Sequence, residues 1–119
     1  MAITEFGKAV RKARIDANGV TLTSMATALQ TTPAFLSALE MGRKRIPTEW
    51  AGKIEGYFQQ HGVSVRLVEL ADIANKTVPI DGLSPAQQML VAGLARVNLD
   101  EAEILNFQQL LASTKGPLK

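Results

Sequence analysis

The chain has 119 residues, enough for one compact domain or one domain with a small appendage. Cysteine is absent, which excludes a disulfide framework and thiol chemistry, and no apolar run approaches the roughly 18 residues of a membrane span. The opening stretch MAITEFGKAV lacks the charged and apolar regions of a signal peptide. We therefore expect a cytoplasmic protein with no membrane contact.

The net charge of +2 is unevenly distributed. Residues 1–66 hold nine Lys and Arg against five Asp and Glu, a balance of +4, whereas residues 67–119 hold four against six, a balance of −2. Binding to phosphates requires positive charge locally, so the first half is the better candidate for contact with a nucleic acid. The charge alone is equally typical of an ordinary solvated surface.

Residues 4–18 are predicted to form the first helix, capped by Thr4 and stopped by Asn18 and Gly19. Its apolar stripe recurs at helical spacing. The stripe consists of Phe6, Val10, Ala13 and Ala17. Lys8, Arg11 and Lys12 are expected in solvent.

Residues 21–47 have the pattern of two short helices joined by a tight turn. Thr21 is a suitable cap for the first helix, and Thr32 followed by Pro33 suits the start of the second. Gly42 is placed to end the second helix, directly before a run of three basic residues. This arrangement is typical of a helix-turn-helix that binds DNA.

The same stretch resembles the Cro/cI-type, or XRE-type, helix-turn-helix repressors. The resemblance extends over roughly residues 6–58, about half of the chain. It departs from the common family pattern at Leu22 and Gln30. Leu22 cannot donate a hydrogen bond to a phosphate. The residues that carry it are Thr21, Met25, Ala26, Leu29, Thr32, Leu36, Leu39, Glu40, Gly42 and the basic run to Pro47.

The resemblance implies an all-α, lambda-repressor-like domain of five helices and an ion pair between Arg14 and Glu40. It also implies that the second helix of the motif enters the major groove of DNA. The candidate DNA-binding residues are Thr21, Thr23, Thr32, Pro33, Ala34, Phe35, Ser37, Ala38, Arg43, Lys44 and Arg45.

The candidate residues predict an unusual way of reading DNA. Pro33, Ala34 and Ala38 carry no hydrogen-bonding side chain, so they cannot make bidentate hydrogen bonds to bases. Ala34, Ala38 and Phe35 instead offer apolar contact to thymine methyl groups. Arg43 and its two basic neighbours are expected to contact phosphates. Phe35 has two readings, contact with a base or packing against a neighbouring helix.

Two further helices are predicted at residues 47–58 and 64–75. Trp50 and Tyr57 are interpreted as core residues in preference to a stacking platform for single strands. His61 stands alone without patterned partners, so we expect neither a metal site nor catalysis there. We expect no cofactor and no enzymatic activity.

Residues 76–119 are predicted to form an extension of the DNA-binding domain, which we place at residues 1–75. The segment 76–82 is β-branched and contains Pro79, which indicates a short extended or edge segment. Two amphipathic helices follow, capped by Ser84 and Asp100, and Gly116 and Pro117 end the second. The candidate oligomerisation residues are Thr77, Val78, Ile80, Leu90, Leu94, Val97, Ile104, Phe107 and Leu111.

The sequence thus predicts a sequence-specific regulator of transcription that binds double-stranded DNA, a phage- or prophage-type repressor acting as a homodimer on an inverted repeat. The alternative is an antitoxin or adaptor whose C-terminal half binds a partner protein, such as a toxin or another regulator. A third reading keeps the helical scaffold without DNA binding.

Overall fold

The computed structural model describes residues 3–114, and these residues form seven helices and no strand. The chain divides into two compact units, Met1–Pro79 and Ile80–Lys119. The first unit therefore ends four residues beyond the predicted boundary at residue 75, because Thr77 still bonds to the first unit. The predicted stop at Gly116 and Pro117 lies outside the described residues. None of the described helices is long and apolar enough to cross a membrane.

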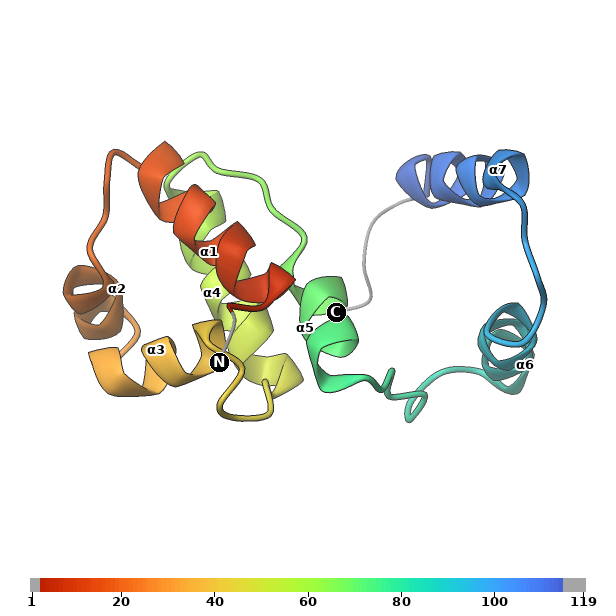
Figure 1. The fold of residues 1–119 in the computed structure, drawn as a ribbon, viewed down its shortest axis with the longest axis horizontal. Coiled ribbons are helices and arrows are strands. Elements are labelled where there is room, and N and C mark those ends of the chain that lie inside the picture. Colours follow the sequence, from red (N-terminus) through yellow and green to blue (C-terminus); the bar gives the residue numbers. More distant parts are fainter. Residues whose placement is uncertain (1–2, 115–119) are drawn as a thin grey trace. The chain divides into compact units, whose positions relative to one another are not determined.

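Five helices build the first unit (Figure 1). They are α1 (Glu5–Asp16), α2 (Leu22–Ala28), α3 (Pro33–Glu40), α4 (Thr48–Gln60) and α5 (Leu67–Asn75). Helix α1 packs against both α3 and α5, α4 packs against α5, and α2 packs against α3. A single apolar core results, in which Phe6, Met25, Leu36, Leu39 and Phe58 are among the largest fully buried side chains.

The predicted helix starts of the first unit are confirmed where a threonine provides the cap. The hydroxyl oxygens of Thr4, Thr21 and Thr32 accept hydrogen bonds from the backbone N–H three residues later, at 3.0–3.1 Å. Gly42 follows α3 with a φ of +71°, a left-handed conformation in which glycine is favoured.

Helix α5 begins three residues later than the predicted start at Ser64. Arg66 has a non-helical backbone, and the Leu67 N–H donates to the Glu55 carboxylate at 2.8 Å. Glu55 belongs to α4, so the cap of α5 comes from a different helix. A sequence pattern that looks only for local caps does not detect it.

The second unit contains α6 (Pro85–Leu94) and α7 (Glu101–Ala112). Both predicted caps are confirmed: Ser84 accepts from Gln87, and Asp100 and Glu103 form a reciprocal capping box. The segment before α6 forms no strand, and the Gln88 side chain donates to the carbonyl oxygens of Ile80 and Leu83. No described residue of α6 or α7 is buried.

Gly7 allows α1 and α3 to approach closely. A Cβ atom at this position would lie 2.1 Å from the backbone oxygen of Glu40, the last residue of α3. Real carbon atoms do not come so close to an oxygen, so any larger residue must push the two helices apart.

We expect Gly7→Ala to lower the free energy of unfolding by at least about 2 kcal/mol, because the added methyl group overpacks this junction. Gly52→Ala is the control, since Gly52 lies exposed within α4 and a Cβ there meets nothing within 4 Å. The control should be neutral or gain up to about 1 kcal/mol from helix propensity. Denaturant unfolding of both variants measures the difference, and equal stability would contradict the close approach.

Candidate nucleic-acid interface

The C-terminal end of α3 is fixed to α1 by the Glu40 side chain. Glu40 is 3% exposed, and its Oε1 accepts from Arg11 Nε at 3.3 Å and from Arg14 Nη2 at 3.4 Å. The predicted pair with Arg14 is therefore confirmed. Arg11 is exposed, as expected, and its guanidinium also serves Glu40 as a second partner, which the sequence did not predict.

The Glu40 ion pairs leave part of the buried charge uncompensated. Glu40 Oε2 and Arg14 Nε are both buried without a hydrogen-bond partner among the described residues. Desolvation by burial therefore raises the pKa of the Glu40 carboxyl, although Arg14 and Arg11 act in the opposite direction. The backbone adds a second connection, because Thr4 Oγ1 donates to the Glu40 carbonyl oxygen at 3.2 Å.

The candidate residues on α2 and α3 lie mainly at the two helix starts. Thr21, Thr23, Thr32, Pro33 and Ala34 are exposed. Thr21 and Thr32 use one lone pair of the hydroxyl oxygen for the helix cap, so each hydroxyl proton stays available to a further acceptor.

Three other candidate DNA-binding residues on α3 are only partly exposed. Ser37 and Ala38 are half-buried, since each lies next to a buried leucine, Leu36 or Leu39, on a helix of only eight residues. Phe35 packs edge-on against Trp50 of α4, with the ring centroids 4.9 Å apart. Of its two readings, the packing against a neighbouring helix is the one observed.

The basic loop, residues 41–47, connects α3 to α4 and exposes three basic side chains. Lys44 Nζ lies 5.9 Å from the centroid of the Phe35 ring, toward α3. Arg45 Nη1 donates to Thr77 Oγ1, just after the end of α5, at 3.4 Å. The Arg45 charge also opposes the rise in the pKa of the Asp72 carboxyl that burial and Glu69 cause. The loop backbone is anchored by Ile46, whose side chain is 1% exposed.

The basic side chains of residues 3–75 fall into two groups, those with a carboxylate partner and those without one. Every Lys and Arg of residues 3–75 outside the basic loop lies within 4.0 Å of a carboxylate oxygen. Arg43, Lys44 and Arg45 have no such partner among the described residues. The basic side chains of residues 3–75 that lack a carboxylate partner are therefore those of the basic loop.

The residue that holds the basic loop in place is Asn75, which was not among the candidate residues predicted from the sequence. The Asn75 side chain at the end of α5 bonds to both backbone groups of Ile46, at 2.7 and 2.8 Å. Asn75 and Ile46 are 29 residues apart, and an asparagine near a helix end reads as an ordinary stop signal. The local sequence therefore contains no signal for this contact.

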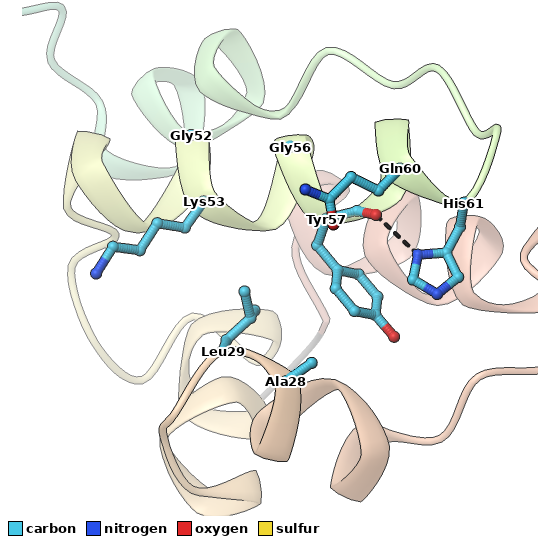
Figure 2. Close-up of a pocket in the computed structure, with 8 residues that line it drawn as sticks. All are labelled: Ala28, Leu29, Gly52, Lys53, Gly56, Tyr57, Gln60 and His61. Atoms are coloured by element: carbon cyan, nitrogen blue, oxygen red, sulfur yellow. Dashed lines mark hydrogen bonds between the residues drawn. The ribbon is translucent and has the colours of Figure 1, made fainter.

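A shallow pocket of about 410 Å³ lies between α2 and α4 (Figure 2). Gly52 and Gly56 contribute no side chain to its α4 wall, where a Cβ atom at either position would meet nothing within 4 Å. Tyr57 and His61 lie at one end, and His61 Nδ1 is 2.9 Å from the Tyr57 carbonyl oxygen. None of the candidate DNA-binding residues lines this pocket. No group of three potential metal ligands occurs in the described part of the chain.

The candidate oligomerisation residues of the second unit are exposed. Leu90, Leu94, Val97, Ile104, Phe107 and Leu111 expose between 42% and 72% of their surface. The helices therefore do not bury their predicted stripes against each other. Val78 and Ile80 are also exposed, whereas the hydroxyl of Thr77 bonds to Arg45.

No family model, no curated protein and no solved structure matches this chain.

We expect Glu40→Ala to lower the free energy of unfolding by about 1–3 kcal/mol, because it leaves the Arg14 charge buried without its partner. Arg14→Ala should also destabilise, and the double variant should lose less than the sum of the two single losses. Denaturant unfolding in a double-mutant cycle measures the coupling, and strict additivity would mean that the two residues do not interact.

The raised pKa of Glu40 also predicts the sign of a pH dependence. Its contribution to stability is fully present below the ordinary pKa of 4.5 and is lost as the pH rises through the raised value. The stability of the wild type relative to Glu40→Gln should therefore fall as the pH rises above about 4.5. A relative stability that rises with pH would show that the two arginines outweigh the desolvation.

Proposed function

We propose that this chain is a regulator of transcription that binds specific sequences in double-stranded DNA, as a Cro/cI-type repressor in the cytoplasm. In this proposal Met1–Pro79 is the DNA-binding domain, with a lambda-repressor-like arrangement of five helices, and α2 and α3 form the helix-turn-helix. The N-terminal turn of α3 enters the major groove. The protein needs no cofactor for this activity.

One observation carries the proposal: the unpaired basic side chains are concentrated in the loop that follows α3, and Lys44 Nζ lies 5.9 Å from the ring centroid of Phe35, in the first turn of that helix. A solvated surface without a polyanionic partner gives no reason for three adjacent cations to lack carboxylates while all other cations of residues 3–75 have them. Phosphates are the ligands that such a loop fits, because each contact releases counterions from the DNA. The same observation disfavours a pure scaffold.

Sequence recognition would rest on few direct hydrogen bonds. Pro33 and Ala34 are exposed on the first turn of α3 and have apolar side chains that fit thymine methyl groups. The exposed hydroxyl of Thr32 can donate to a base edge or a phosphate. Most of the remaining selectivity would come from the shape of the DNA, which the basic loop senses through the phosphates.

We expect Arg43→Ala to weaken binding to the DNA upstream of the protein's own coding sequence and to a random duplex alike. The slope of log affinity against log salt should fall by about one, since one phosphate contact is lost. Arg66→Ala is a control of equal charge change, because Arg66 is paired with Glu69 and lies before α5, at the opposite end from Asn75. Mobility-shift titrations at several salt concentrations decide. An equal loss in the control, or no binding by the wild type, would contradict the proposal.

We further propose that the second unit joins two copies of the chain into a homodimer. Among residues 3–114, ten of the thirteen exposed large apolar side chains belong to this shorter unit. At roughly 50 Å² for each half-exposed side chain, ten of them offer on the order of 500 Å² of apolar surface. This is close to the apolar share of a standard homodimer interface, which buries about 800 Å² per partner.

Helix α6 is the best candidate for the centre of this interface. It carries no charged residue between Pro85 and Leu94, yet Met89 and Leu90 are more than 70% exposed. A helix without a charged face is normally buried. Helix α7 has charged and amide side chains on part of its surface, and only that part suits the outside of such an assembly. A dimer would also set two copies of α3 about one DNA turn apart, for an inverted repeat.

Light scattering at tens of micromolar should give twice the mass of one chain. Truncation after Pro79 should give a folded, mostly monomeric domain with much weaker operator affinity, because the first unit has its own core. A full-length monomer that binds its operator tightly as one copy would end the dimer proposal. If α6 and α7 instead bind a co-purifying toxin or other regulator, the antitoxin or adaptor function is supported in its place.

A further inference from the structure

At the end of α5, the side-chain amide of Asn75 contacts the basic loop with one donor and one acceptor, the same groups that a backbone peptide offers. Asn75 Nδ2 donates to the Ile46 carbonyl oxygen at 2.7 Å, and Asn75 Oδ1 accepts from the Ile46 N–H at 2.8 Å. The two bonds also determine the orientation of the Asn75 amide. In the reversed amide, the NH₂ group would face the Ile46 N–H and the Oδ1 atom would face the Ile46 carbonyl oxygen. Both backbone groups of a residue with a buried side chain are thereby satisfied.

The residues that follow Asn75 add to this connection. Thr77 Oγ1 accepts from Arg45 Nη1 at 3.4 Å, so the residues on both sides of Lys76 contact the basic loop. Lys76 is exposed and has no carboxylate within ion-pair distance among the described residues. It is the one cation of residues 3–79, outside the loop itself, with no such partner.

We propose that the end of α5 completes the phosphate-binding surface of the basic loop, with Lys76 as a fourth phosphate-binding cation and Asn75 as its positioning residue. The inference rests on the DNA binding proposed above and names residues that the helix-turn-helix pattern does not contain. Residues 43–45 and 76 are then one binding surface, built from two segments that the Asn75 amide holds together.

The physical reason is that four like charges repel each other when no counterion is bound. A free loop would respond by moving its cations apart, and binding would then have to overcome both this repulsion and the loss of loop entropy. The Asn75 amide fixes the loop at Ile46 without adding or removing charge. The cations are therefore already in place before a polyanion arrives, which reduces the ordering required on binding.

Asn75→Ala tests the positioning role, because it removes both bonds and leaves the net charge unchanged. With a random duplex, we expect affinity to fall about tenfold and the salt slope to fall by about one or more, since displaced cations no longer meet phosphates. Lys76→Ala should lower the slope by about one. Asn75→Asp retains the acceptor for the Ile46 N–H but directs a carboxylate at the Ile46 carbonyl oxygen, so it should also weaken binding.

Glu55→Ala is the control for general destabilisation. It removes the bond from the Leu67 backbone N–H at the start of α5, and it removes a negative charge, which cannot by itself weaken binding to a polyanion. We expect it to lower the melting temperature as Asn75→Ala does, while the salt slope stays at the wild-type value. Amide hydrogen exchange at Ile46 should accelerate in Asn75→Ala and not in the control.

The outcomes separate the inference from the proposed function. A wild-type slope in both Asn75→Ala and Lys76→Ala, with the wild type binding DNA, overturns the inference alone. A reduced slope in Glu55→Ala equal to that in Asn75→Ala also overturns it, because general destabilisation then explains the effect. A wild type that binds no DNA overturns both.

Discussion

The buried carboxylate of Glu40 is the interaction on which the arrangement of the first unit depends. It ends α3, and its partners Arg11 and Arg14 come from α1, so the ion pairs determine where the end of α3 lies. A buried carboxylate is costly without partners, and the two arginines offset that cost only in part. Gly7 is required at the same junction, because only a residue without Cβ lets α1 reach the Glu40 backbone.

The basic side chains of residues 3–75 are either paired with carboxylates or lie in the basic loop. The basic side chains of α1 and α4, and Arg66 before α5, are paired with carboxylates, whereas those of the basic loop are not. The loop begins directly after the Glu40 junction and is fixed at its far end by Asn75. Two long-range side-chain contacts therefore position a short loop of like charges, which is the basis for the proposed binding of phosphates.

The second unit differs from the first in that it exposes many large apolar side chains. Its helices are well capped, yet no described residue of either helix is buried. Caps and propensity provide only part of the stability of a short helix, and most comes from packing of an apolar face. The described part of the unit lacks such packing, which is the reason for the proposed contact with a second copy of the chain.

The sequence alone determined the local features of this protein. Helix starts were predictable at Thr4, Thr21, Thr32, Ser84 and Asp100, because a capping side chain acts within three residues of itself. The stop at Gly42 and the core leucines of α3 were predictable for the same reason, since helical spacing and turn conformation are local properties.

The tertiary structure decided what depends on residues far apart in the chain. Arg11 shares Glu40 with Arg14, Phe35 packs on Trp50, and Glu55 caps a helix other than its own. The Asn75 contact with Ile46 belongs to the same group. Each of these contacts joins segments that only the folded core brings together, and no local pattern of residues encodes the direction in which such side chains meet.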